Sequence, residues 1–162
     1  MMNTLGSWVV QTAGNLLRNR RLVRAPIWIY RVRLGAVFGR RLLMLEHRGR
    51  KTGIRRYVVL EVIDSPAPDQ YIVASGFGLR AQWLRNIQHD PQVRVSVGSR
   101  PPRPATAELL DREPTALALR RYADRHPRAW QQLKPVFEEI LGSPINEEDT
   151  GLPLVRLTLG PA

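Results

Sequence analysis

The spacing of apolar residues changes near residue 40, from a helical period to the shorter period of strands. Leu5, Trp8 and Val9 recur three or four positions apart, whereas Val93 and Val95 alternate with polar residues. The first spacing is typical of one face of a helix and the second of a half-buried strand. Apolar, β-branched runs predict six strands, over residues 41–47, 55–63, 71–75, 92–98, 105–110 and 152–159.

Glycine, proline and helix-boundary residues divide these strands. A short helix over 81–90 stops before Pro91, and two more helices are expected from about 113 to 126 and from about 127 to 141. The run "DSPAPDQ" at 64–70 predicts a turn, and residues 76–80 a flexible glycine loop. Regular strand–helix alternation is absent, which favours a small barrel over a doubly wound sheet. We expect a mainly β fold with flanking helices (α+β), with about six mostly antiparallel strands.

The length of 162 residues suits one compact domain. Residues 41–162 are expected to form the barrel, and residues 1–40 a basic amphipathic helical segment packed on it or flanking it. The first 45 residues hold eight arginines and no acidic residue, so this segment either packs on the domain or lies on an anionic membrane surface. No membrane span or secretion signal is recognisable. We therefore expect a cytoplasmic protein, with peripheral attachment to the inner membrane face as an alternative.

The formal net charge is +11, and only Lys51 and Lys134 are lysines among the 25 basic residues. Arginine-rich usage can follow genomic base composition, but an arginine fork also suits carboxylates and phosphates. A basic nucleic-acid-binding protein would interleave aromatic residues with basic ones on a strand face, and the predicted strands offer almost none. Nucleic acid is therefore not the expected partner.

The chain contains no cysteine, which excludes disulfides and thiolate chemistry. The spacing of His47, His89 and His126 is not that of metal ligands, so we expect all three at surface or turn positions and predict no metal site. Sequence motifs of nucleotide-binding loops and serine hydrolases are absent as well. If the protein is an enzyme, a cofactor is expected to supply the reactive group.

The highest concentration of charge lies in the turn between the first two predicted strands, with five cationic residues among residues 48–56. Gly49 and Gly53 permit backbone angles closed to other residues, and the tip between them can present two charges, a hydroxyl and backbone N–H groups to an anion. Arg55 and Arg56 alternate along the outgoing strand, so we expect Arg56 on the ligand side and Arg55 in water. By itself such a turn favours a solvated hairpin over a patch for nucleic acid or membrane, or a cradle for a small polyanion.

An ordered set of motifs favours the cradle for a small polyanion over the solvated hairpin. "GRKTGxxR" at 49–56 is followed by a strand ending at Ala74-Ser75-Gly76, a glycine loop, Trp83-Leu84-Arg85-Asn86 and "DPQVRVSV". This order resembles the deazaflavin (F420)-dependent nitroreductase family, split β-barrel oxidoreductases that use reduced coenzyme F420 as hydride donor. The likeness covers about residues 42–109 and continues more weakly toward the carboxyl end.

The resemblance implies a cofactor site formed by four segments. The phosphodiester and glutamate tail of F420 need a fixed cationic complement. The implied catalytic residue is Ser75, as a hydrogen-bond donor to the electron acceptor, and no proton donor is assigned. The implied cofactor-binding residues are Arg50, Lys51, Thr52 and Arg56 at the phosphate and acidic tail, Tyr57, Val58, Val59 and Leu60 along the ring, Ala74, Ser75 and Gly76 at its reactive edge, and Trp83, Arg85 and Asn86 on the helix that closes the pocket.

The implied activity is hydride transfer from F420H2 to an electron-poor acceptor such as a quinone or nitro compound. Some members that reduce nitro compounds carry a tyrosine where this chain has Glu61, and another after a Tyr-Pro pair where this chain reads "DRHPRAW". Tyr122 or Trp130 would have to fill that space, and Arg80 would have to replace a basic residue that follows the serine. These departures weaken the case for nitro reduction. The alternatives are a non-catalytic split barrel that binds F420, flavin mononucleotide (FMN) or haem, and a basic nucleic-acid-binding protein.

Overall fold

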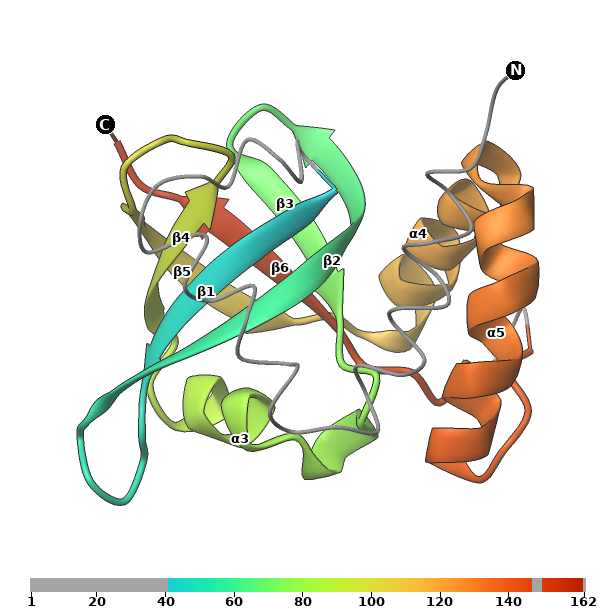
Figure 1. Ribbon diagram of the computed structural model, residues 1–162, viewed down its shortest axis with the longest axis horizontal. Coiled ribbons are helices and arrows are strands. Elements are labelled where there is room, and N and C mark those ends of the chain that lie inside the picture. Colours follow the sequence, from blue (N-terminus) through green and yellow to red (C-terminus); the bar gives the residue numbers. More distant parts are fainter. Residues whose placement is uncertain (1–40, 147–149, 162) are drawn as a thin grey trace.

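The alternating apolar runs form a closed barrel in the computed structural model, which describes residues 41–146 and 150–161. Each strand is antiparallel to both neighbours, in the order β1-β2-β3-β6-β5-β4 (Figure 1). The expected mainly antiparallel, six-stranded barrel is confirmed. The strands are β1 (Leu42–Arg48), β2 (Arg55–Ala67), β3 (Gln70–Ala74), β4 (Gln92–Val97), β5 (Arg103–Leu109) and β6 (Leu154–Leu159).

Three helices and one 3₁₀ turn, η3 (Gly78–Arg80), complete the described fold: α3 (Gln82–His89), α4 (Arg112–Arg125) and α5 (Pro127–Leu141). Gly142 ends α5 in the left-handed conformation, at φ +72°. Viewed as in Figure 1, α3 lies across one end of the barrel, beside the long β1–β2 hairpin, and α4 and α5 lie along one side.

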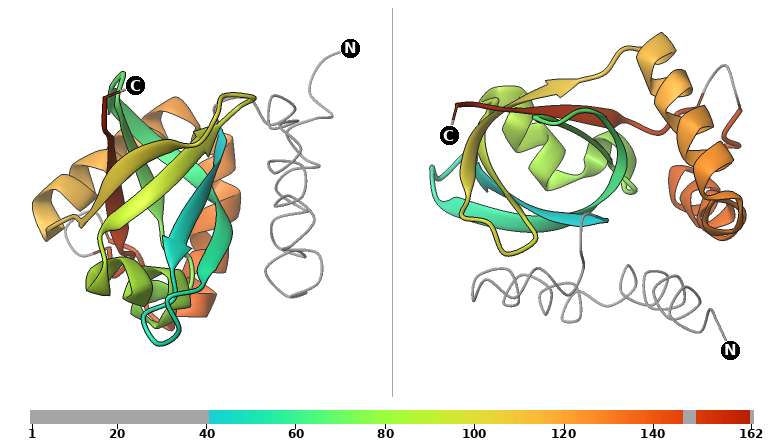
Figure 2. Two further views of the ribbon diagram at one scale, coloured as in Figure 1. Left: turned by 90° about the vertical axis from the view of Figure 1, so that its left-hand side faces the viewer. Right: turned by 90° about the horizontal axis from the view of Figure 1, so that it is seen from above.

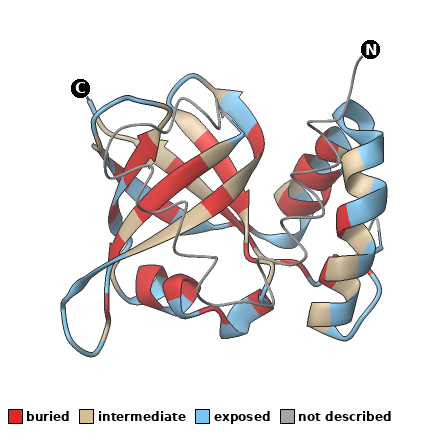
Figure 3. Cartoon of the chain, in the orientation of Figure 1, coloured by how far each residue is buried: buried red, intermediate tan, exposed pale blue. Residues whose placement is uncertain are grey.

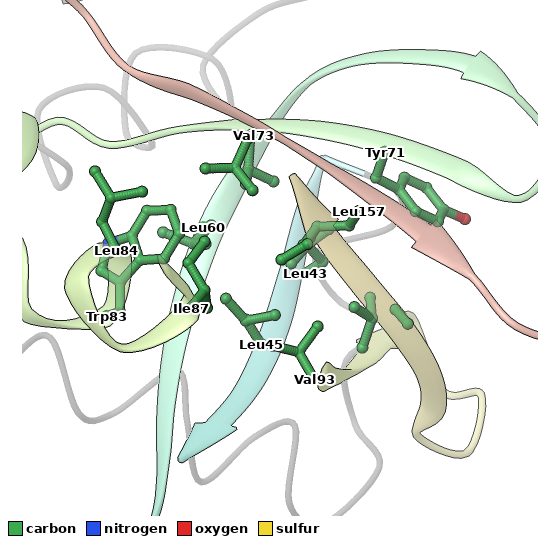
Figure 4. Close-up of a cluster of buried hydrophobic side chains, with 14 of the residues drawn as sticks. Leu43, Leu45, Leu60, Tyr71, Val73, Trp83, Leu84, Ile87, Val93 and Leu157 are labelled. Atoms are coloured by element: carbon green, nitrogen blue, oxygen red, sulfur yellow. The ribbon is translucent and has the colours of Figure 1, made fainter. Parts of the chain in front are cut away.

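The barrel interior is filled by every second residue of the strands, because side chains alternate between the two faces of a sheet. Leu43 and Leu45 of β1 and Leu157 of β6 are 0% exposed. Trp83, Leu84 and Ile87 of α3 extend toward these residues and close one end of the core (Figure 4). The helix nearest the hairpin is therefore part of the folded core.

A second apolar cluster joins α4 and α5 to the outer face of β2, β3 and β6. Ile63, Ile72 and Leu154 contribute the strand side, and Leu119 and Phe137 belong to the helix side. The two views of Figure 2 show both helices beside the barrel. In Figure 3, buried positions concentrate on the strands, α3 and α4, and exposed ones on the hairpin tip and along α5. The barrel thus has one covered outer side and one end at which the hairpin projects.

Two predictions from the sequence need correction. The turn expected at 64–70 is shorter, because β2 continues to Ala67 through two register shifts against β3, with Asp64 between them. The prediction that His47 lies at the surface or in a turn is also wrong, because His47 lies within β1 and is only 4% exposed. The register of the barrel turns His47 inward beside α3. His89 and His126 are exposed as expected.

The predicted amphipathic helices of residues 1–40 lie outside the described residues. Among the residues that the structure describes, no helix is both long and apolar enough to cross a membrane.

Candidate functional site

The β1–β2 turn is closed by backbone hydrogen bonds that centre on Gly49. The Gly49 N–H donates to Ile54 O at 2.9 Å, and the Thr52 and Gly53 N–H groups donate to Gly49 O at 3.2 and 2.7 Å. Gly53 has φ +67°, a conformation that residues with a side chain rarely adopt. The prediction of free N–H groups at the tip is therefore only partly correct, since the Thr52 N–H is used within the turn and the Arg50 N–H donates to Asn86 Oδ1.

The space above Gly49 is formed by two polar groups. A Cβ at this position would lie 2.9 Å from Thr52 Oγ1 and 3.0 Å from Arg56 Nε, so either side chain would have to move to admit it. The missing Cβ therefore lets a hydroxyl and a guanidinium converge over the turn. This pair fits a phosphate or carboxylate oxygen, because both groups donate hydrogen bonds and one carries a charge. Lys51 at the tip is exposed to solvent.

Arg50 is held against α3 by three hydrogen bonds. Its backbone N–H donates to Asn86 Oδ1 at 3.1 Å, and its Nη1 donates to the same oxygen at 3.1 Å and to Gln82 Oε1 at 3.0 Å. Within residues 41–146 and 150–161 the structure gives the other nitrogens of this guanidinium no partner. Arg50 is thus fixed in direction by amide oxygens, keeps its full charge and can still donate to a ligand.

Asn86 in turn lies against His47. Asn86 Nδ2 is 3.2 Å from His47 Nδ1, and Asn86 is 3% exposed. The pKa of His47 is lowered to about 4, chiefly by burial and to a smaller extent by the charge of Arg56. A backbone hydrogen bond with Arg48 acts in the opposite direction and raises this pKa. The imidazole is therefore neutral at pH 7.

The cations of the hairpin divide into two kinds. Arg55 is paired with Glu46 across the strands at 3.5 Å and is exposed, in line with its expected place in water. In the described part of the chain, Arg48, Arg50, Lys51 and Arg56 have no carboxylate partner within 4.0 Å. Among the described residues, no carboxylate therefore neutralises these four cations, which suits the binding of an anion.

The four predicted β2 residues lie on two different faces. Val58 and Leu60 pack with the barrel interior, so Tyr57 and Val59 point to the outer face. Trp83 is 8% exposed and also belongs to the interior. Of the predicted ring-lining residues, Tyr57 and Val59 therefore have side chains on the outer face of β2, whereas Val58, Leu60 and Trp83 belong to the barrel core.

The segment at Ala74, Ser75 and Gly76 leaves the barrel at the same end as the hairpin, because β1 and β3 run in the same direction. Ser75 is 0% exposed, and its hydroxyl donates to Gly78 O at 2.8 Å. A Cβ on Gly76 would lie 3.0 Å from Phe137 Cε1, so glycine permits the close contact with α5. The structure thus places this segment against η3 and α5.

Helix α3 connects the two halves of the site, because it begins after η3 and its residues Gln82 and Asn86 accept hydrogen bonds from Arg50 of the hairpin. Arg85, next to Asn86, is exposed, and its Nε donates to Leu79 O at 3.3 Å. Arg80 donates to Ile140 O at 3.3 Å, which links η3 to α5. These two arginines therefore brace the loop after Ser75.

Two groups that the sequence did not join are in contact at the side of the barrel. The Tyr122 hydroxyl donates to Glu61 Oε1 at 2.8 Å, and Arg41 Nη2 lies 3.6 Å from that oxygen. Burial, together with the Glu61 carboxylate, raises the pKa of Tyr122 well above its ordinary value. Tyr122 thus contacts Glu61, the strand position at which the resemblance implies a tyrosine in some family members. Trp130 packs edge-on against the Tyr122 ring, with 6.2 Å between the ring centroids. Only the fold could show this pairing, since 61 positions separate the two residues.

In the described residues, no three or more His, Cys, Asp or Glu side chains are grouped so that they could hold a metal ion. The donor set at the hairpin is cationic and amide-based, which suits an anionic organic ligand and not a divalent cation.

Comparison with known proteins gives a family and a fold. The model of the F420H(2)-dependent quinone reductase family matches residues 22–135. A Mycobacterium tuberculosis protein, Rv3178, provisionally named an F420H(2)-dependent quinone reductase, is 34% identical over 87 residues, which are 50% of this chain and 72% of the relative.

Solved structures agree on the split-barrel fold. An F420-H2 dependent reductase, FDR-A, aligns with a TM-score of 0.52 and 20% identity over 74% of this chain and 95% of its own. Protein Atu2129 of Agrobacterium tumefaciens, of unknown function, aligns with a TM-score of 0.53 and 20% identity over 85% of this chain and 56% of its own. HutZ, the haem storage protein of Vibrio cholerae, aligns with a TM-score of 0.52 and 15% identity over 83% of this chain and 89% of its own. At these identities the structures establish the fold alone.

Proposed function

This chain belongs to the F420H(2)-dependent quinone reductase family, and we propose that the barrel end between the β1–β2 hairpin and α3 holds the acidic tail of F420. The protein is accordingly an oxidoreductase that transfers hydride from F420H2 to a quinone. The observation that carries the proposed site is a group of four cations that have no carboxylate partner among the residues the structure describes, one of which, Arg50, is fixed by amide oxygens.

F420H2, when bound, supplies the hydride, and the protein contributes binding, orientation and charge. Thr52 and Arg56, which converge over Gly49, would bind phosphate oxygens, and Arg50 and Lys51 the neighbouring carboxylates. Tyr57 and Val59 would line the ring from the outer face of β2.

The segment from Ala74 to Gly76 would stand at the reactive edge of the ring. Ser75 remains the proposed hydrogen-bond donor to the acceptor, and its hydroxyl now donates to Gly78 O. To reach an acceptor it would have to exchange that bond for a new one. Arg85, through Leu79 O, would hold α3 against η3, and Asn86, through Arg50, would hold it against the hairpin.

The test of the proposed function is a titration of the purified protein with oxidised F420, followed by tryptophan quenching and by calorimetry. Saturable binding at micromolar F420 is expected, together with oxidation of F420H2 on addition of a quinone. Saturation by FMN or haem in the absence of F420 binding would favour the non-catalytic alternative. Binding of F420 without turnover of any quinone or nitro compound would indicate carriage of the cofactor.

The basic first forty residues support a separate proposal about location, which rests on sequence alone. We propose a cytoplasmic protein whose amino-terminal segment binds anionic membrane surfaces, where quinones dissolve. Deleting residues 1–24 should abolish sedimentation with anionic liposomes and leave F420 binding unchanged. Equal sedimentation of the truncated and full chains would contradict the proposal.

A further inference from the structure

His47 is a buried polar residue that the proposed function does not yet use. It follows Leu43 and Leu45 on the inward face of β1, and both His47 and Asn86 are almost fully buried. Buried polar groups are costly to leave without partners, so the contact between His47 and Asn86 compensates both.

Arg50 determines how the hydrogen bonds of this group run. It brings two donors, its backbone N–H and its Nη1, to the same Oδ1 of Asn86. A reversed amide would place an NH2 group against both donors, so Asn86 must offer its oxygen to Arg50 and its NH2 to His47. His47 Nδ1, 3.2 Å from Nδ2, must then be an unprotonated acceptor, with the ring proton on Nε2.

We infer that His47 is a positioning residue of the F420 site: as a neutral acceptor it holds Asn86 in the one amide orientation that fixes Arg50. The inference rests on the proposed function, in which Arg50 binds the acidic tail of the cofactor. It adds a residue that touches no ligand and yet sets the direction of one that does.

The surroundings keep His47 in the required form. Burial first, and then the charge of Arg56, disfavour the imidazolium, although the Arg48 backbone favours it. Arg56 is also the cross-strand partner of His47, and Arg50 lies beyond Asn86. A protonated ring would turn an N–H toward the Asn86 NH2 group and add a third positive charge, so Asn86 and Arg50 would lose their arrangement.

The first test compares the affinity of three variants for oxidised F420 by calorimetry at pH 7.5. His47→Leu removes the acceptor and should raise Kd about five- to tenfold, the effect of one buried hydrogen bond. His47→Asn keeps an oxygen acceptor near the place of Nδ1 and should stay within about twofold of wild type. His89→Leu, an exposed histidine on α3, is the matched control and should bind as wild type does.

The second readout is independent of the cofactor. Two-bond proton–nitrogen spectra of the ¹⁵N-labelled protein should show His47 as the Nε2–H tautomer, and the Asn86 NH2 signals should move in His47→Leu but not in His89→Leu. If His47→Leu does not fold, His47→Asn and these spectra decide the question.

The outcomes separate the two proposals. Wild-type protein that does not bind F420 would overturn the proposed function and, with it, the inference. Wild-type binding combined with equal binding by His47→Leu, with tenfold weaker binding by a folded His47→Asn, or with an Nδ1–H ring would overturn the inference alone.

Discussion

Two clusters of cationic side chains in this molecule differ in the groups that contact them. In the hairpin cluster, Arg48, Arg50, Lys51 and Arg56, the neighbours of Arg50 are amide oxygens and a neutral histidine lies behind them. In the helix α4 cluster, Arg121 and Arg125 both face Asp64 of β2, at 3.6 and 2.6 Å. The first cluster keeps its positive charge, whereas the second shares a buried carboxylate.

This difference separates binding arginines from structural ones. Asp64 is 6% exposed and sits at the irregular part of β2, where its Oδ1 also accepts from the Ser65 N–H at 2.8 Å. Its two arginines therefore join α4 to the barrel. The arginines of the hairpin cluster have no such partner in the described residues, so an anion from outside can supply it.

The largest expected effect comes from removing the uncompensated charge. Arg50→Ala combined with Lys51→Ala should weaken F420 binding by about 1.5 to 3 kcal/mol for each charged hydrogen bond lost. Calorimetric Kd values measure this effect. The matched control, Arg120→Ala with Arg128→Ala, lowers net charge equally at exposed helical positions and should leave the affinity near wild type. Equal losses in both double variants would mean that overall charge, not the hairpin cluster, binds the cofactor.

Removing the buried carboxylate of Asp64 should lower stability and leave F420 affinity unchanged. Asp64→Ala leaves Arg121 and Arg125 without their acid, and because both are half-exposed, water compensates in part. The free energy of unfolding should fall by about 2 to 3 kcal/mol, below the cost of stranding a fully buried charge. Urea denaturation measures it, with the exposed Asp124→Ala as control. F420 affinity should not change, and a tenfold loss of affinity would refute the division between the clusters.

The histidine of the hairpin region should make stability depend on pH. Its pKa falls from 6.5 in the unfolded chain to about 4 in the fold, so between these values the unfolded state binds more protons. Stability from His47 is therefore complete above about pH 6.5 and is lost as the pH falls toward 4. From pH 7 to pH 5 this amounts to about 2 kcal/mol. Denaturation of wild type and His47→Asn at both values isolates the effect, and parallel slopes would contradict it.

The smallest effect concerns the second contact between α4 and β2. Tyr122→Phe removes the 2.8 Å hydrogen bond to Glu61 but keeps the ring against His126 and Trp130. Unfolding free energy should fall by about 1 kcal/mol, as for one hydrogen bond. Tyr71→Phe is the control, because the Tyr71 hydroxyl has no partner in the described residues. A loss as large as that of Asp64→Ala would show that Tyr122 fastens α4 to β2 as strongly as the two arginines do.

Local sequence signals were sufficient for most of the elements. Alternating valines predicted β4, and Pro91, Pro127 and Gly142 marked helix ends close to their observed places. The predicted turn at 64–70 was too long because Asp64, a polar residue two positions before a proline, resembles a loop residue. Only its arginine partners from α4 explain a buried aspartate within a strand.

The candidate site divides in the same way. The positive charges and the spacing of the glycines indicated Arg50, Lys51, Thr52 and Arg56 as site residues. In the structure Arg50 contacts Asn86, Thr52 and Arg56 converge over Gly49, and Lys51 is exposed at the tip. Sequence could not tell that Val58 and Leu60 face inward while Tyr57 and Val59 face outward, because alternation gives two faces without saying which is covered. The role proposed for Ser75 stays a prediction, with its hydroxyl on Gly78 O.

The sequence by itself determined the period of each segment, the sign of the charge and the glycines that shape the hairpin, since these depend on neighbours in the chain. Tertiary structure alone decided which arginines meet an acid. Arg50 meets amide oxygens 32 and 36 positions away, and Arg125 meets Asp64 61 positions away. Charge compensation depends on distance in space, and closing the barrel brings these residues together.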